Sequence, residues 1–157
     1  MSFSEEQVGV FARAMNQGSP QAMALGIETV EVGGGRSLLR IPYKDEMVGD
    51  PETGVIAGGV VTTLLDHACG QAVFACLTEP TSIATLDLRI DYMRPAEPHQ
   101  PLYAAAHCYK LGRQVAFVRA TAYERSPDDP VATAQAAFML NSSAGKPMGA
   151  NLKPHTR

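Results

Sequence analysis

The spacing of hydrophobic positions predicts a helix at the start of the chain. Four apolar side chains recur there at helical spacing: Val8, Phe11, Ala12 and Met15. Ser4 and Gln7 stand three residues apart at its beginning, as in a capping box. The Gly-Ser-Pro segment at 18–20 then ends the pattern. We therefore expect an amphipathic helix over residues 4–17.

A hairpin and a loop are predicted next. Residues 22–32 end in apolar and polar alternation and predict a strand. Three glycines at 33–35 favour a turn, since glycine adopts positive φ freely, and residues 36–43 predict the returning strand. Residues 44–57 contain Asp50-Pro51 and predict an irregular loop.

Residues 58–77 have a different pattern, apolar on nearly every side of a helix about five turns long. Such a helix is surrounded by protein rather than lying on a surface. Its Val and Thr residues are poor helix formers, so tertiary packing must stabilise it. We expect it at the centre of the fold.

Beyond Pro80 the period changes to two, which predicts strands. In the first, one face would hold Leu86, Leu88, Ile90 and Tyr92, and the other Asp87, Arg89 and Asp91. Residues 101–111, 114–125 and 130–140 predict three more strands joined by short turns, hence antiparallel neighbours. Their alanine-rich faces allow close approach of either the helix or a second subunit: Ala104, Ala106, Ala116, Ala120, Ala122, Ala132, Ala134 and Ala136.

The predicted class is α+β, with a curved antiparallel sheet wrapped around a long central helix and an additional N-terminal helix. Residues 1–140 form one domain, and residues 141–157, without periodicity, are expected to be a flexible C-terminal tail. A length of 157 residues suits a single domain.

Charge and composition exclude several function classes. The formal net charge of −3 argues against broad nucleic-acid binding. The longest apolar stretch, residues 60–77, contains an aspartate, a histidine and a glutamine, so it is no membrane span. The N-terminus resembles no signal peptide, and we expect a cytoplasmic protein.

Cysteine and histidine spacing does not predict a disulfide scaffold or a metal site. Cys69, Cys76 and Cys108 are odd in number, form no C-x-x-C motif and are expected to be small buried residues. The four histidines show no ligand spacing: His67, His99, His107 and His155. We expect His67 to be a polarised or a hydrogen-bonded core histidine, His99 to be solvated and His107 to pack or lie at an interface.

Asp66 is the most informative residue, because it lies in the middle of the apolar helix. An ionised carboxylate there is costly unless it is paired or hydrated. Three roles remain open: catalysis, an ion pair with Arg89 or Arg119, or a position at a subunit boundary.

Gly58 and Gly59 begin the same helix and expose first-turn N–H groups at its positive end. A carbonyl oxygen bound there would be polarised as in an oxyanion hole. Alternatively, the glycines only let the helix enter a crowded site.

Gly59 and Asp66 are seven residues apart, on one helix face and about 10 Å apart along the axis. Thr62, Thr63 and Gly70 complete that face.

Four segments carry a family resemblance: IAGGVVTTLLDHACGQA, TLDLRIDYMRPA, LGRQVAF and VATAQAAFML. Together they resemble the hotdog-fold acyl-CoA thioesterases of the phenylacetate-degradation (PaaI-like) type, in the 4-hydroxybenzoyl-CoA thioesterase superfamily. The resemblance covers roughly residues 20–140 and implies hydrolysis of an acyl-CoA thioester to a free acid and CoA. It also implies a homo-oligomer, a dimer or dimer of dimers, with sites between subunits. CoA enters as part of the substrate, and no metal or other cofactor is expected.

The resemblance assigns roles to individual residues. Asp66 matches the catalytic carboxylate, nucleophile or general base, and Gly58 the residue whose N–H polarises the thioester carbonyl. Thr85 matches a Ser or Thr that positions water, although its place in the strand requires an irregularity. The CoA part of the substrate would be contacted by four residues: Gly59, Arg94, Gly112 and Arg113. Both arginines fit solvated turns equally well.

The chain departs from the family pattern before the helix. Ala57 stands where members usually carry a histidine, and Pro51 where they often carry an asparagine. A lost side-chain donor at a polarised carbonyl costs on the order of 10²–10³ in rate. This departure keeps open a non-catalytic acyl-CoA binding or regulatory protein. A hydratase or dehydratase is a further alternative, but it needs a histidine in the carboxylate's cavity, and His67 points about 100° away from Asp66 around the helix.

Overall fold

The structure is a computed structural model that describes residues 4–79 and 81–141. The helices are α1 (Glu5–Gln17), α2 (Pro20–Leu25) and α3 (Gly58–Phe74), with a short 3-10 helix, η1 (Asp45–Met47). The strands are β1 (Glu28–Gly33), β2 (Arg36–Ile41), β3 (Val48–Asp50), β4 (Val55–Ile56), β5 (Ser82–Tyr92), β6 (Leu102–Leu111), β7 (Val115–Tyr123) and β8 (Ala132–Asn141).

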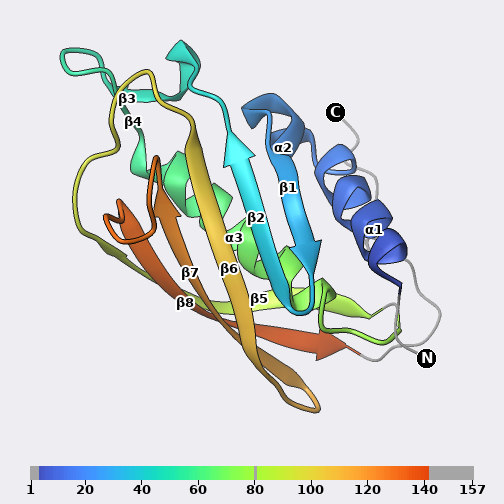
Figure 1. Ribbon diagram of the computed structural model, residues 1–157. Helices are drawn as coiled ribbons and strands as arrows, with labels where there is room; N and C mark the ends of the chain where they lie inside the picture. The colour runs from blue at the N-terminus through green and yellow to red at the C-terminus, as the bar shows by residue number, and fades with distance from the viewer. Residues whose placement is uncertain (1–3, 80, 142–157) are drawn as a thin grey trace, which may run out of the picture.

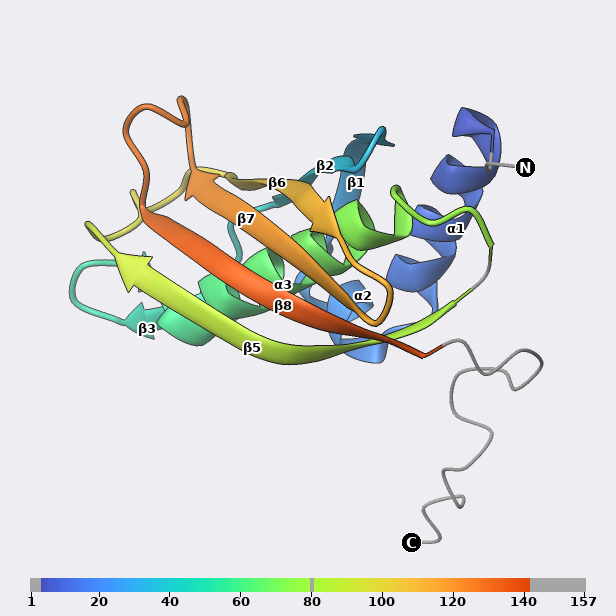
Figure 2. The same ribbon diagram turned by 90° about the horizontal axis from the view of Figure 1, so that it is seen from below.

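Six of these strands form one antiparallel sheet in the order β1-β2-β6-β7-β8-β5. Figure 1 shows this sheet in front of α3, with α1 beside β1. Figure 2 shows the sheet curving around α3, and β5 running along one edge. The predicted class, a curved antiparallel sheet around a long central helix with an N-terminal helix, is confirmed.

Alanine explains how closely α3 and the sheet pack. The eight alanines predicted to permit close approach are all buried, and α3 packs mainly against β6, β2 and β7. The alanine-rich faces therefore allow the close approach of α3 rather than of a second subunit. From the helix, Leu64, Leu65 and Val73 are completely buried, as expected for a helix surrounded by protein. Burying side chains of this size contributes about 1.5–3 kcal/mol each.

The N-terminal helix was predicted closely. Ser4 accepts a hydrogen bond from the Gln7 backbone, and the Gln7 side chain accepts one from the Ser4 backbone, so the capping box is present. Among the described helices, none combines the length and apolarity needed to cross a membrane.

Two predicted segments were wrong. Residues 22–25 belong to α2 rather than to a strand, because Ser19 caps a helical turn and Pro20 occupies its first position. Residues 44–57 are not an irregular loop throughout, because they hold η1 and the β3–β4 hairpin. The central helix also ends at Phe74, three residues before the predicted Leu77. The expected flexible tail, apart from Asn141 at the end of β8, lies outside the described residues.

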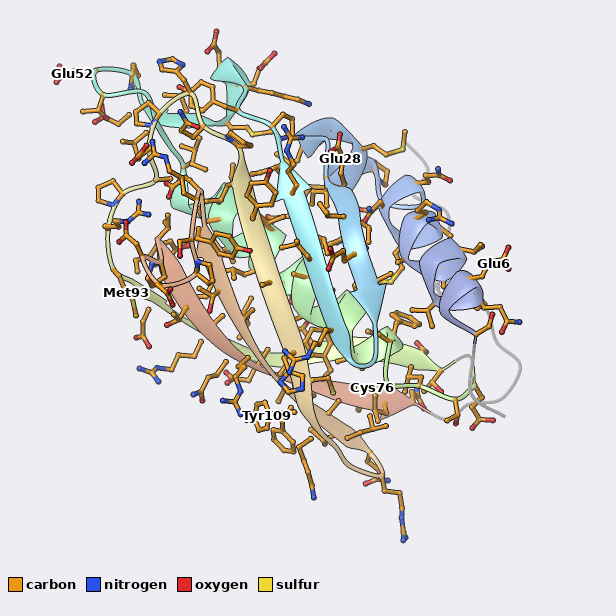
Figure 3. The ribbon with its side chains drawn as sticks, in the orientation of Figure 1. Glu6, Glu28, Glu52, Cys76, Met93 and Tyr109 are labelled. Carbon is orange, nitrogen blue, oxygen red and sulfur yellow. The ribbon has the colours of Figure 1, made fainter. Side chains whose placement is uncertain are left out.

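The cysteines are free, as expected, but not all are buried. Cys69 and Cys108 are buried, whereas Cys76 is partly exposed. Figure 3 shows Cys76 beyond the end of α3, near the β1–β2 turn. A Cβ at Gly35 would lie 2.6 Å from the Cys76 sulfur, so this turn approaches the end of α3 closely.

Candidate active site

The carboxylate in the centre of α3 is held by a hydroxyl from the sheet edge. The Thr85 Oγ1 donates a hydrogen bond to Asp66 Oδ1 at 2.9 Å. Asp66 is partly buried and Thr85 is exposed, so the pair lies on an open side of the chain. β5 has a neighbouring strand on one side only, which leaves this side of the site uncovered within one chain.

A β-bulge in β5 allows the Thr85 hydroxyl to reach Asp66. Thr85 lies opposite Phe138 and Asp87 opposite Ala137, so Leu86 is an extra residue in β5. The bulge puts Thr85 on the face of Leu88 and Ile90, toward the helix, which is the strand irregularity that its predicted place required. The same bulge makes one expectation wrong, because Leu86 is 54% exposed instead of sharing the inner face.

Asp66 does not form the ion pair that the sequence left open. Arg89 pairs with Asp91 at 3.0 Å, and the guanidinium of Arg119 lies over the Tyr109 ring at 4.6 Å from its centroid. Among the described residues, no Lys or Arg is paired with Asp66. Two of the three roles considered for Asp66 remain, catalysis and a position at a subunit boundary. The uncovered edge of β5 is compatible with both.

The first turn of α3 is uncovered at its glycines. A Cβ on Gly59 would meet nothing within 4 Å, and one on Gly58 would meet only the Tyr92 ring and hydroxyl at ordinary contact distances of 3.5–3.8 Å. Within one chain, crowding therefore does not explain the glycine pair. Ala57 is the N-cap and supplies no side-chain hydrogen bond. No described residue accepts a hydrogen bond from the Gly58 or Gly59 N–H.

Tyr92 is the residue that sequence reasoning missed at this site. Its hydroxyl donates to the carbonyl oxygen of Gly58 at 2.7 Å and lies 2.7 Å from the Thr62 hydroxyl. Alternation placed Tyr92 on the helix face of β5, but nothing in the pattern placed it at the start of α3. The available signal for a role at the site was its position at the end of the strand, immediately before Met93-Arg94-Pro95.

An apolar hollow of about 350 Å³ adjoins Gly58 and Tyr92. Figure 3 shows Met93, one of its lining residues, at the margin of the molecule. The other lining residues are mostly apolar, with Arg94 as the one charged member: Val55, Ile56, Val61, Arg94, Pro95, Ala96 and Val131. Clefts with such linings suit hydrocarbon groups rather than charged ones.

His67 faces away from this site and is hydrogen-bonded, as predicted, but it is only partly buried. Its Nε2 lies 2.9 Å from Asn16 Oδ1, which also accepts a hydrogen bond from Gln71 at 2.9 Å. Gln71, with no exposed surface, further donates to the Ala12 carbonyl and accepts from Thr29. Burial lowers the pKa of His67, and the negative charge of Asp66 offsets part of that lowering. The imidazole ring is therefore mostly neutral at neutral pH. This network fixes α1 to α3.

The remaining titratable candidates lie elsewhere. Burial raises the pKa of the Cys69 thiol to about 12, which makes it a poor nucleophile at neutral pH. His99 is exposed, as expected, and its ring packs against Tyr43 with centroids 4.7 Å apart. His107 lies in β6 opposite Arg36 and Arg119, and the pKa of His107 is lowered by partial burial and by these two cations. Among the described residues, no three His, Cys, Asp or Glu side chains are grouped to hold a metal.

Of the residues expected to contact CoA, Arg94 is already engaged. It donates to both carboxylate oxygens of Glu124, at 2.6 and 3.2 Å, and to Asp129 at 3.1 Å. Two carboxylates thus surround one guanidinium, which leaves no uncompensated positive charge for a phosphate.

Arg113 is exposed in the turn before β7, and Gly112 closes that turn, where a Cβ would lie 2.7 Å from the Val115 oxygen. A CoA contact stays a prediction for all four residues, with Arg113 the freer cation.

Comparison with known proteins places these features in a family. A family model described as the thioesterase superfamily matches residues 53–131, which include the glycine pair, Asp66 and Thr85. The chain belongs to the thioesterase superfamily. This confirms the resemblance to hotdog-fold, PaaI-like thioesterases and indicates a hydrolase acting on thioesters.

Individual thioesterase-superfamily relatives cover most of the chain. The medium/long-chain acyl-CoA thioesterase YigI of Salmonella typhimurium is 29% identical over 136 residues, 77% of this chain and 85% of that protein. A Halobacterium salinarum protein, named provisionally as an esterase, is 36% identical over 94 residues, but the match spans only 58% of this chain and 61% of that protein.

Several solved structures share the fold. A Pseudomonas aeruginosa protein is 39% identical, with a TM-score of 0.77 over 84% of this chain and 98% of that chain. A thioesterase family protein from Silicibacter pomeroyi is 27% identical, with a TM-score of 0.76 over 88% of this chain and 98% of that chain. The PaaI protein of E. coli, 22% identical, shows the fold alone, with a TM-score of 0.71 over 82% of this chain and 89% of its own.

Proposed function

We propose that the protein hydrolyses acyl-CoA thioesters to a free acid and CoA. The observation that carries the proposal is the Thr85–Asp66 hydrogen bond on an open edge, together with a glycine-opened helix terminus on the same helix. Thioesterase-superfamily membership supports thioester chemistry, and the likeness to YigI supports an acyl-CoA substrate.

The thioester carbonyl would bind at the first turn of α3. The N–H groups of Gly58 and Gly59 point out of the helix end, where the helix dipole adds positive potential. Hydrogen bonds from these groups stabilise the negative charge that develops on the carbonyl oxygen during attack. The apolar hollow beside Gly58 would then receive the hydrocarbon part of the acyl group.

Asp66 supplies either the nucleophile or the general base. As a base, it takes a proton from water while the water oxygen bonds to the carbonyl carbon, and the C–S bond then breaks to release CoA thiolate, which is reprotonated. The Thr85 hydroxyl donates a hydrogen bond to Asp66, so its oxygen lone pairs stay free to accept a hydrogen bond from that water. As a nucleophile, Asp66 would attack the carbonyl carbon and form a mixed anhydride as the C–S bond breaks and CoA thiolate leaves. Water would then hydrolyse the anhydride to the free acid and the Asp66 carboxylate.

Within one chain, the helix terminus that would bind the carbonyl and the Asp66 carboxylate lie too far apart to act on one thioester. Gly58 and Asp66 are eight residues apart on α3, a separation of about 12 Å along the helix axis. A thioester bound at one helix terminus therefore needs the carboxylate of another subunit. We propose a homodimer, or a dimer of dimers, in which two α3 helices run antiparallel beside the open edges of β5. Each site would combine the glycines of one subunit with Asp66 and Thr85 of the other.

A non-catalytic acyl-CoA binding protein is the second candidate, and Ala57 is the observation that favours it. Ala57 gives no side-chain hydrogen bond at the start of α3. A hydratase or dehydratase is disfavoured, because His67 is bound to Asn16 on the side of α1.

The test is CoA release from a panel of short, medium, long and aromatic acyl-CoAs, followed by thioester absorbance. We expect wild-type turnover and a loss of about 10³-fold in Asp66→Asn. The matched control is Asp128→Asn, which neutralises an exposed carboxylate in the turn between β7 and β8 and should retain full rate. No turnover with any ester, while acyl-CoAs still raise the melting temperature, would contradict hydrolysis and favour the binding protein.

A further inference from the structure

The peptide between Gly58 and Gly59 carries one of the two N–H groups proposed to polarise the thioester. Glycine has more backbone freedom than any other residue, so two in succession are a weak support for an aimed donor. Ala57 adds no side-chain cap that would fix the turn. A side-chain donor from outside α3 would restrict this peptide further and help the Gly59 N–H to point reproducibly at a substrate.

Tyr92 provides that support from the sheet. Its hydroxyl donates to the Gly58 carbonyl oxygen at 2.7 Å, from a strand that begins after α3 has ended. The Thr62 hydroxyl contacts both atoms, at 3.1 Å from the Gly58 oxygen and 2.7 Å from the tyrosine oxygen. Because a peptide is planar and trans, holding its C=O also fixes the direction of its N–H.

Thr62 by itself is an ordinary feature. A helical threonine often bonds the carbonyl four residues earlier, and the neighbouring Thr63 does so to Gly59 at 2.9 Å. What distinguishes the Gly58 carbonyl is the Tyr92 hydroxyl from β5, which donates to it while the Thr62 hydroxyl can donate either to the same carbonyl or to Tyr92. A donor on a peptide oxygen also polarises the whole peptide and strengthens its N–H as a donor.

We propose that Tyr92 is a positioning residue, which sets the direction and donor strength of the Gly59 N–H at the thioester carbonyl. The inference rests on the proposed function, because it requires a carbonyl to be bound at this helix terminus. Tyr92 itself acts through the peptide and does not touch the reacting atoms.

The variant that tests this role is Tyr92→Phe, which keeps the ring beside the hollow and removes only the hydroxyl. The chain offers a matched control, Tyr43→Phe, which removes a tyrosine hydroxyl that donates to the Gly54 carbonyl at 2.8 Å in the loop before β4. We expect Tyr92→Phe to lower kcat about tenfold with KM within about twofold, because the donor is weakened in the transition state. Tyr43→Phe should keep the wild-type kcat.

A spectroscopic measurement separates positioning from general destabilisation. The probe is a ketone analogue of the best acyl-CoA, in which CH₂ replaces the thioester sulfur and the carbonyl carbon is ¹³C. Its C=O stretch should move to lower wavenumber on binding to the wild type and to Tyr43→Phe, and should move less in Tyr92→Phe. This readout depends on polarisation of the carbonyl and not on turnover.

The outcomes distinguish the two proposals. Wild-type hydrolysis with an unchanged kcat and carbonyl shift in Tyr92→Phe overturns the positioning role and leaves the proposed function standing. Equal losses in Tyr92→Phe and Tyr43→Phe also overturn it, because both would then report stability. If the wild type neither hydrolyses the esters nor binds the ketone, both proposals fail.

Discussion

Thr85 donates a hydrogen bond to Asp66 at 2.9 Å, although the two residues are nineteen positions apart and lie on different elements. The bond depends on the bulge at Leu86, which turns Thr85 toward α3. It gives the carboxylate one fixed partner and engages only one of its two oxygens. The pair therefore suits a carboxylate that acts on something outside its own chain.

Replacing Thr85 should test the water-positioning role. We expect Thr85→Val to lower kcat about 10- to 100-fold with little change in KM, because the orienting hydroxyl is lost while the side-chain shape is kept. Thr85→Ser, which retains the hydroxyl, should restore most of the rate. Steady-state kinetics with the best acyl-CoA provide the measurement, and equal activity of the valine and wild-type proteins would remove Thr85 from the mechanism.

Gly59 should show opposite effects on stability and activity. Gly59→Ala meets no atom within 4 Å in one chain and improves helix propensity, so the free energy of unfolding should rise by about 0.5–1 kcal/mol. The added methyl group obstructs the approach to the helix N–H groups, so kcat/KM should fall at least about tenfold. Gly9→Ala, in the middle of α1, is the control that should give similar stability without loss of activity. Denaturant unfolding and kinetics decide the matter, and a destabilised Gly59→Ala with normal activity would speak for a packing role.

Mixing inactive subunits should reveal whether the site is shared. Asp66→Asn and Gly59→Val should each be inactive as homodimers. In a heterodimer, the intact Gly59 of one chain meets the intact Asp66 of the other, so one of its two sites works. After co-refolding of equal amounts we expect about a quarter of the wild-type activity per subunit, because about half of random dimers are mixed. No recovery, with mixed dimers demonstrated by mass spectrometry, would place both groups in one subunit.

The Arg94–Glu124 pair should make stability depend on acidic pH. Glu124 has a side chain that is only 2% exposed. Burial raises the pKa of this carboxyl, but hydrogen bonds from Arg94 and the Glu97 backbone outweigh burial and hold the pKa below its ordinary value of 4.5. A lowered folded-state pKa means that the contribution is complete above about 4.5 and is lost as pH falls through the folded-state value.

We therefore expect Glu124→Gln to cost about 2 kcal/mol at neutral pH and to flatten the loss of stability as the pH falls below about 4.5. The control is Glu97→Gln, which breaks the exposed pair with Arg125 and should cost less than about 1 kcal/mol. Urea unfolding at several pH values is the measurement. If the two variants have the same pH profile, the buried carboxylate is not the source of the dependence.

Hydrophobic patterning determined the architecture, because burial of apolar side chains is a periodic property of the local sequence. The period of 3.6 in α1, the all-round apolarity of α3 and the alternation of the last three strands each predicted their elements. The same reasoning failed for residues 22–25, where a capping serine and a proline outweighed the strand pattern. It also missed the β3–β4 hairpin, whose strands are too short to show a period.

For the site, the sequence by itself determined which groups lie on α3: a carboxylate in an apolar helix and two glycines at its start, at a spacing fixed by helix geometry. Only the tertiary structure decided their partners. The bulge that directs Thr85 to Asp66, the tyrosine that reaches the Gly58 carbonyl and the carboxylates that engage Arg94 all join residues distant in sequence. Such contacts depend on strand register and on the approach of one element to another, and local patterning carries no information on either.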